Sequence, residues 1–185
     1  MNVYYIIWAL WLLSEILLNR LIHSGKTDKK NTDKRTLLLI WITIAISITL
    51  GILSQAWFKS TISTSVWIPR AGLLLIVLGM LLRFLAIRSL GRMFTVDVTI
   101  RKNHQIKQDG LYRLVRHPSY SGSLVSFLGF GISLNSWVSL GIILILVTGA
   151  MLLRIRTEEK VLLDQFGSEY EAYMRKTRRL IPWIY

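Results

Sequence analysis

Side chains that could do chemistry gather in two polar stretches of this sequence, residues 91–122 and 154–185. The first offers groups that both donate and accept hydrogen bonds, and the second offers fixed charge. These groups are His104, Tyr112, His117 and Tyr120 in the first stretch and Arg154, Glu158 and Glu159 in the second. An apolar stretch separates them, and if it folds as a helical hairpin it returns the chain to the side it left. We therefore expect each polar stretch to hold half of one site.

Several common kinds of chemistry lack support in the sequence. There is no cysteine, which excludes disulfides, thiolate catalysis and thiolate metal sites. The three histidines do not have the His-x-x-x-His spacing of a helical zinc site, so we expect no metal. Phosphate-loop, Rossmann and Gly-x-Ser-x-Gly spacings are also absent.

Arg154 and Glu158 are four residues apart, so on a helix they share one face. That spacing is equally typical of an exposed and weak surface ion pair. Taken alone, it does not distinguish a surface pair from two residues of a functional site. His117-Pro118 predicts the start of a helix, because proline suits the first helical turn and restricts the residue before it.

Three segments of the C-terminal half stand out: GLYRLVRHPSYSG (residues 110–122), RIRTEEKVLLDQFGSEYEAY (154–173) and TRRLIP (177–182). Together they resemble the isoprenylcysteine carboxyl methyltransferase family and its prokaryotic relatives. The resemblance covers about the C-terminal half of the chain, with the segments in the family's order and an apolar hairpin between them. Residues 1–90 are similar only in character. Phospholipid N-methyltransferases and some thiol S-methyltransferases share the same layout.

The resemblance implies S-adenosylmethionine as cofactor, in a cytoplasmic pocket roofed by the C-terminal segment. A lipophilic or prenylated acceptor would enter from the bilayer. The cofactor-binding residues implied by the motifs are His104, Gln105, Ile106, Lys107, Tyr112, His117, Pro118, Ser119, Tyr120 and Glu158. Arg154 is implied to be the catalytic residue that grips the acceptor carboxylate, with Arg116 and Arg179 as further substrate-binding candidates.

The chemistry of the acceptor bears on these roles. A carboxylate has a pKa of about 4, so it is already a nucleophile at neutral pH and needs no general base. An arginine would suffice to orient it by a bidentate pair. A thiol or amine must lose a proton, and then His117, Glu158 or Glu159 would have to act as the base. Two other classes stay open: an NADPH-dependent membrane reductase, because membrane sterol reductases have a similar layout, and a non-catalytic basic membrane anchor.

The elements that position these residues are predicted to be membrane helices. Hydrophobic residues make up 52% of the chain, and residues 3–21, 37–58 and 71–90 are each long enough to cross a bilayer. Residues 121–153 are too long for one span and contain the helix-breaking pair Asn135-Ser136, so we expect a hairpin of helices 121–134 and 137–153. The alternative is a re-entrant helix pair that enters the membrane without crossing it.

The predicted fold is therefore an all-α integral membrane protein of about five helices. It forms one membrane domain, residues 1–185, with three helices in residues 1–90 and the cofactor-binding half in residues 91–185.

Positive charge predicts the orientation of this bundle. The formal net charge is +13, and all Lys and Arg residues except Lys59 and Arg70 fall on one side of a five-span topology. Short cytoplasmic loops collect Lys and Arg, so we expect the N-terminus outside and the C-terminus in the cytoplasm. Membrane topology and contact with lipids then account for the positive net charge. We therefore expect no nucleic-acid partner.

Two further expectations concern side chains inside the bundle. Glu15 and Arg83 lie at comparable depth in the first and third helices, and intramembrane charges are usually paired or functional. They are predicted either to form a structural ion pair or to line a substrate channel. The tryptophans are assigned to interfacial anchoring, because most lie near predicted span ends. They are Trp8, Trp11, Trp41, Trp57, Trp67, Trp137 and Trp183.

Overall fold

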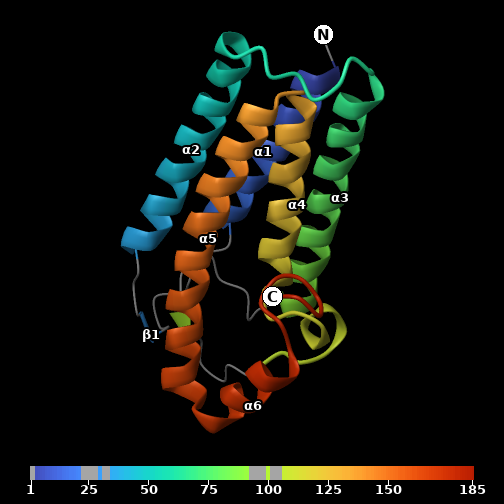
Figure 1. Ribbon diagram of the computed structural model, residues 1–185. Helices are drawn as coiled ribbons and strands as arrows, with labels where there is room; N and C mark the ends of the chain where they lie inside the picture. The colour runs from blue at the N-terminus through green and yellow to red at the C-terminus, as the bar shows by residue number, and fades with distance from the viewer. Residues whose placement is uncertain (1–2, 22–28, 31–33, 92–98, 101–105) are drawn as a thin grey trace.

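The computed structural model describes residues 3–21, 29–30, 34–91, 99–100 and 106–185. Within these ranges five long helices run side by side and a short sixth helix lies at one end (Figure 1). The helices are α1 (Val3–Leu21), α2 (Lys34–Trp57), α3 (Trp67–Leu90), α4 (Pro118–Ser133), α5 (Trp137–Phe166) and α6 (Ser168–Lys176). A 3₁₀ turn, η2 (Gly110–Arg113), precedes α4, and the two-residue strands β1 (Lys29–Lys30) and β2 (Thr99–Ile100) pair antiparallel.

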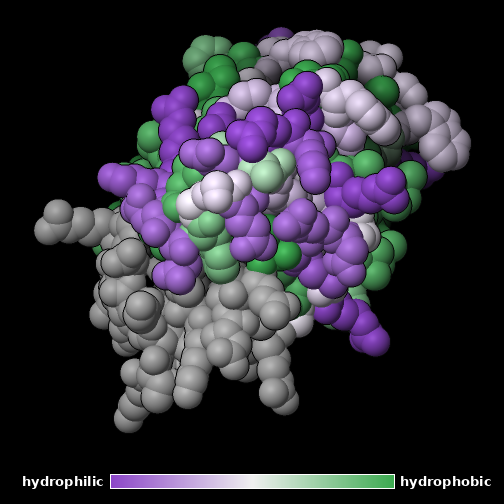
Figure 2. Space-filling model, turned by 90° about the horizontal axis from the view of Figure 1, so that it is seen from below, coloured by the Kyte–Doolittle hydropathy of each residue, from purple (hydrophilic) through white to green (hydrophobic). Residues whose placement is uncertain are grey.

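Helices α2 (from Thr36), α3 and α5 are each long and apolar enough to cross a membrane. The apolar part of α1, Val3–Leu18, is shorter, and α4 has 16 residues. The chain is therefore an all-helical integral membrane protein with three candidate spans in its described part. Viewed from the end where α6 lies, hydrophilic residues cover the middle of the face and hydrophobic residues appear around it (Figure 2).

The helix boundaries follow local chemistry. Helix α4 begins at Pro118, as His117-Pro118 predicted and three residues before the apolar arm 121–134, because proline fits the first helical position and needs no hydrogen-bond acceptor there. It ends at Ser133, and α5 begins at Trp137 after Asn135, which has φ 54°, and Ser136, whose side chain accepts from Ser139 N. The predicted break at Asn135-Ser136 is confirmed.

Helix α5 continues without interruption to Phe166, well past the predicted apolar arm. It stops at Gly167, which has φ 51°, a conformation that glycine adopts readily. One rigid element thus carries both apolar bundle residues and the charged residues of the second polar stretch.

Glycines let α3 and α4 meet backbone to backbone. A Cβ added at Gly72 would lie 2.6 Å from Gly129 O, and one at Gly79 would lie 2.5 Å from Gly122 O. No side chain fits at such distances, so these positions need glycine. Small residues at a helix interface increase the packing contact, which is the main attraction between helices in a bilayer.

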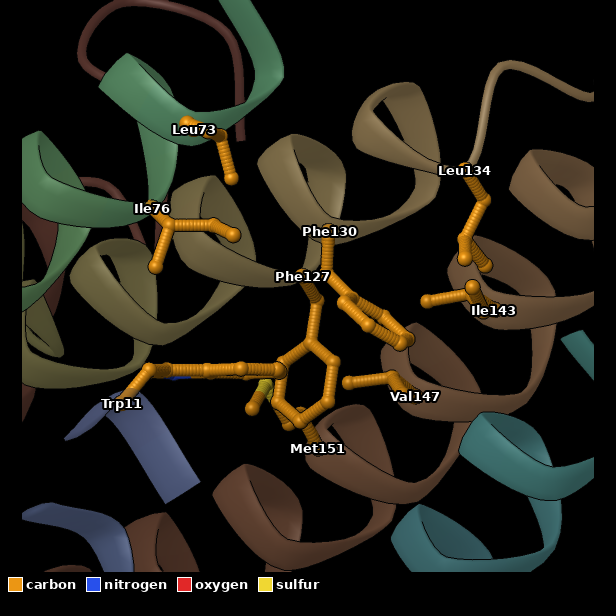
Figure 3. Close-up of a cluster of buried hydrophobic side chains, with 9 residues drawn as sticks. All are labelled: Trp11, Leu73, Ile76, Phe127, Phe130, Leu134, Ile143, Val147 and Met151. Carbon is orange, nitrogen blue, oxygen red and sulfur yellow. The ribbon is translucent and has the colours of Figure 1, made fainter. Parts of the chain in front are cut away.

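A cluster of buried apolar side chains joins α1, α3, α4 and α5 (Figure 3). Its centre is Trp11, which is fully buried, with its ring edge-on to Phe127 at 4.8 Å between centroids. Phe130 and Met151 complete this part of the cluster.

The assignment of all tryptophans to interfacial anchoring is therefore wrong for Trp11, which packs in the protein interior. Trp8 also contacts another helix of the bundle, because its Nε1 donates to Ser133 Oγ of α4 at 3.0 Å. The remaining tryptophans outside the site, Trp57, Trp67, Trp137 and Trp183, are mostly exposed, as anchoring requires.

Candidate functional site

One cavity takes its lining from all five long helices and η2. It contains about 880 Å³ of empty space, its open mouth included. Its polar lining consists of Glu15, Arg83, Tyr112, Arg116, His117, Ser119, Tyr120, Ser123, Arg154 and Glu158. The residues predicted from the two polar stretches therefore meet in space, and residues 1–90 also contribute to the same cavity.

Arg154 forms part of the α5 wall of the cavity. Its residue is 2% exposed, and its Nη1 donates to Thr36 Oγ1 of α2 at 2.6 Å. The surface-pair alternative is wrong for Arg154, because a guanidinium this deeply buried is shielded from solvent. Glu158, one turn further along α5, also lines the cavity and keeps a third of its side chain exposed.

Glu15 and Arg83 form the predicted ion pair, with 3.1 Å between Glu15 Oε2 and Arg83 Nη2. The Nη1 group of Arg83 donates to Ser119 O at 3.2 Å and to Ser123 Oγ at 2.7 Å. Pairing and hydrogen bonding offset the cost of placing these charges within the bundle. Because both side chains line the cavity, the pair is also part of the candidate site, which the sequence motifs did not indicate.

Glu159 is the hub of a buried polar cluster beside the cavity, and its side chain is 4% exposed. It accepts from Arg116 Nε at 2.8 Å and from Arg179 Nε and Nη2 at 2.9 and 2.8 Å. His117 Nε2 lies 3.4 Å from the same carboxylate, and His117 Nδ1 lies 3.8 Å from Glu158. Hydrogen bonding to Glu159 raises the pKa of Arg179 above its usual range.

Glu159 thus binds both of the further substrate-binding candidates, Arg116 and Arg179. Arg116 still reaches the cavity wall, whereas Arg179 is not among the described residues that line it. The sequence named Glu159 only among the charged groups of the second polar stretch and as a candidate base, and not as a partner of Arg116 and Arg179. The sequence does not show that Glu159, rather than its neighbour Glu158, is the buried one, because no spacing rule identifies which of two adjacent acids is buried.

The C-terminal segment closes over this cluster through backbone pairing. Arg116 N donates to Arg178 O at 2.7 Å, and His117 N donates to Arg179 O at 3.0 Å. Ser121 Oγ donates to Leu180 O at 2.6 Å. Residues 178–180 therefore run along residues 115–117 and hold the segment that precedes α4.

The remaining motif residues differ in their placement. Tyr112 is buried, its hydroxyl donates to Ala86 O at 3.3 Å, and burial raises the pKa of Tyr112 well above its ordinary value. It is therefore a neutral hydrogen-bonding group at the cavity. Pro118 is buried at the first position of α4.

His104 and Gln105 lie outside the residues that the structure describes. Ile106 and Lys107 are described but do not line the cavity, and Lys107 pairs with Asp109 at 2.8 Å.

The wall provided by α2 is apolar. It consists of Leu37, Ile40, Trp41 and Ile44. Trp41 is therefore a cavity residue, and its assignment to interfacial anchoring alone is incomplete. Periodicity could not identify this wall, because α2 is apolar nearly all round. In the ranges that the structure covers there is no group of three His, Asp or Glu side chains that could hold a metal ion.

This chain is similar to a family of known methyltransferases. The model of the isoprenylcysteine carboxyl methyltransferase (ICMT) family matches residues 72–164. Protein-S-isoprenylcysteine O-methyltransferase B of Arabidopsis thaliana is 35% identical over 120 residues, which are 64% of this chain and 61% of that protein. The Schizosaccharomyces pombe protein-S-isoprenylcysteine O-methyltransferase is 37% identical over 109 residues, 58% of this chain and 46% of its own length.

A solved structure has the same fold. The eukaryotic intramembrane Ras methyltransferase ICMT superposes with a TM-score of 0.69 at 24% identity, over 98% of this chain and 65% of that one. This chain thus spans less than two thirds of the length of these relatives. The family match covers half of the chain and includes the cavity residues from Arg83 to Glu158. The chain belongs to the isoprenylcysteine carboxyl methyltransferase family.

Proposed function

We propose that this protein transfers a methyl group from S-adenosylmethionine to the carboxylate of a lipophilic, isoprenylcysteine-like acceptor. The observation that carries the proposal is the two-sided cavity. Arg154 and Glu158 lie one turn apart on its polar wall, and the apolar side chains of α2 form another wall. A charged head group and an apolar chain on one molecule match these two walls. The names of the curated relatives support the same reaction.

The polar side chains that line the cavity suit S-adenosylmethionine. Tyr112, His117 and Ser119 offer hydrogen-bonding groups for its nucleoside and amino-acid parts, and the partly exposed Glu158 offers a negative charge for its ammonium group or ribose hydroxyls. When bound, the cofactor supplies an electrophilic methyl group on a positively charged sulfur.

Arg154 is assigned to the acceptor. Its planar guanidinium can bind a carboxylate through two hydrogen bonds and so set its orientation. Burial excludes water from this region, which strengthens the interaction and favours close alignment of the reacting groups. Arg116 and Arg179 are assigned to holding Glu159, because Arg116 Nε and Arg179 Nε and Nη2 contact its carboxylate at 2.8–2.9 Å.

A second candidate acceptor is an amine or thiol, as in methyltransferases with the same layout. The observation in its favour is the His117 ring, which lies 3.4 Å from Glu159 and 3.8 Å from Glu158 and so could accept a proton. A carboxylate needs no such base, and the pH dependence of the rate therefore separates the two candidates.

We also propose that α1 to α5 all cross the membrane, with α4 and α5 as a transmembrane hairpin, the N-terminus outside and the cavity opening to the cytoplasm. The two ends of the chain lie toward opposite ends of the bundle (Figure 1), as an odd number of spans requires. The short α4 would then need local thinning of the bilayer. The distribution of Lys and Arg supports the orientation.

Incubation of the purified protein with methyl-labelled S-adenosylmethionine tests the reaction. The acceptor panel contains a prenylated cysteine carboxylate, an aminophospholipid and an alkyl thiol. We expect label on the carboxylate, and label only on the lipid amine or thiol would reassign the acceptor. Calorimetry with S-adenosylhomocysteine and with NADPH checks the cofactor independently. Binding of NADPH alone would favour a reductase instead.

A further inference from the structure

The last residues of the chain form a closed hook whose apolar side chains point outward. Leu180 N and Ile181 N both donate to Tyr185 O at 2.7 Å, and Tyr185 N donates to Ile181 O at 3.1 Å. The base of the hook is buried at Leu180, whereas its tip is open: Ile181 is 51% exposed, Trp183 83% and Ile184 76%. The hydrogen bonds therefore hold three large apolar groups away from the protein.

The contacts of the hook place it at the edge of the apolar band of the bundle. Ser121 Oγ, in the first turn of α4, donates to Leu180 O. The next residue, Gly122, packs against the backbone of Arg83 on α3. Phe84 and Leu85 follow Arg83 and are half exposed on the outside of this candidate span. The hook thus lies level with the last apolar turns of α3, beside the lower ends of α3 and α4 in Figure 1.

We propose that residues 180–185, the C-terminal hook, dock on the membrane and insert Ile181, Trp183 and Ile184 into the boundary between head groups and acyl chains. Tryptophan and exposed aliphatic side chains favour this layer. Arg178 lies on the paired backbone segments next to the hook, and Arg113 lies at the end of η2 just before them. Both are exposed, so they suit anionic lipid head groups. The partner is the bilayer that already surrounds the helices.

Docking would also stabilise the closed form of the candidate site. Arg179 Nη1 donates to the Tyr185 hydroxyl at 2.8 Å, and its guanidinium lies 5.5 Å from the centre of the Tyr185 ring. The other donors of Arg179 bind Glu159, which also binds Arg116 and His117. Membrane contact at the hook therefore supports the segment that closes over the polar cluster. The importance of this closure for catalysis rests on the proposed function, but the docking itself does not.

Site-directed spin labelling tests the docking, because the chain has no native cysteine. The label is attached to Ile184→Cys, and to the control Arg175→Cys on the exposed side of α6, in vesicles of phosphatidylcholine and phosphatidylglycerol. We expect dissolved oxygen to relax the label at position 184 more than a water-soluble nickel complex does, with the opposite order at position 175. Equal nickel access at both positions would overturn the proposal. Shielding from both reagents at position 184 would overturn it too, because it indicates a protein partner or a second copy.

A second experiment measures the effect on the closed segment by hydrogen exchange of the Arg116 and His117 amides, which donate to Arg178 and Arg179. In vesicles, the double variant Trp183→Ser/Ile184→Ser should exchange these amides about tenfold faster than the wild type, since weaker docking lowers the cost of local opening. The matched variant Trp183→Phe/Ile184→Leu should keep the wild-type rate. The same rate in all three proteins would refute the coupling. Both experiments omit cofactor and acceptor, so their outcome is independent of the methyl-transfer assay.

Discussion

At the scale of single residues, the two adjacent glutamates of α5 have different surroundings. The Glu159 side chain is 4% exposed and is held by two arginines and a histidine, whereas Glu158 is one-third exposed and lines the cavity. A buried carboxylate with three partners stabilises the structure, and a carboxylate at a cavity is available to a ligand. We therefore expect their substitutions to affect different measurements.

Glu159→Gln should lower the free energy of unfolding by about 3 kcal/mol, because it leaves Arg116 and Arg179 as buried or half-buried cations without a counter-charge. Unfolding in detergent, followed by circular dichroism, measures the change. Glu171→Gln is the matched control. Its exposed pair with Arg175 is 4.0 Å long, and its loss should cost no more than about 0.5 kcal/mol. Equal effects of the two substitutions would contradict the hub role of Glu159.

His117→Ala and Glu158→Ala should each weaken S-adenosylhomocysteine binding by about 1–3 kcal/mol, the scale of a lost buried or charged hydrogen bond. Calorimetry on folded variants measures this affinity. Glu169→Ala, in the first turn of α6, is the control and should bind as the wild type does. Unchanged affinity in both site variants would remove the cofactor from this part of the cavity.

Arg154→Lys should reduce kcat/KM for a carboxylate acceptor by about tenfold to a hundredfold, because lysine keeps the charge but loses the planar pair of donors. Cofactor affinity should barely change. Arg156→Lys, two residues further on the same helix and exposed, should retain full activity. If the Arg154 variant were as active as the Arg156 variant, the carboxylate role of Arg154 would be excluded.

The pH dependence of the rate provides an independent test of the acceptor. A carboxylate with a pKa of about 4 is ionised throughout the neutral range, so the rate should stay nearly constant from about pH 6.5 to 9. An amine or thiol acceptor gives a different profile. The rate would rise about tenfold per pH unit below the pKa of the group that loses its proton. Initial rates at saturating cofactor distinguish the two.

At the scale of elements, the tightest contact is the glycine seam between α3 and α4. Gly79→Ala should destabilise the fold by about 1–3 kcal/mol, because its Cβ would lie 2.5 Å from the backbone of α4 and rigid helices cannot separate locally. Gly141→Ala on α5 is the control. Nothing lies within 4 Å of its added methyl, and alanine favours a helix, so stability should stay equal or rise. Detergent unfolding compares the two variants.

At the scale of the whole molecule, the proposed orientation makes the two ends of the chain lie on opposite sides of the membrane. A reporter fused after Tyr185 should be active in the cytoplasm, and one inserted at Thr61, between α2 and α3, should be active outside. Lys59 and Arg70 are too few to reverse this orientation. Reporters active on the same side would require an even number of spans between the two positions.

The sequence by itself determined the helical class, the boundaries of α1 and the break at Asn135-Ser136. These features depend on local properties: a continuous apolar run long enough to cross a bilayer, and residues that interrupt a helix. It also predicted that the residues of the two polar stretches meet and that Glu15 pairs with Arg83. Both follow from topology, since successive helices alternate in direction, so that α1, α3 and α5 run the same way and their ends lie at the same level.

Only the tertiary structure decided which face of each helix is buried. Trp11 lies in the core and Trp41 on the cavity, although both belong to helices that are apolar nearly all round and so carry little rotational signal. For the same reason, the sequence did not show that Glu159 is buried and that its neighbour Glu158 is more exposed. Nor did it show that Arg116 and Arg179 both bind Glu159, since these contacts join residues 20 to 43 positions apart. Local spacing determines which residues share a helix face, but the packing of helices determines what that face contacts.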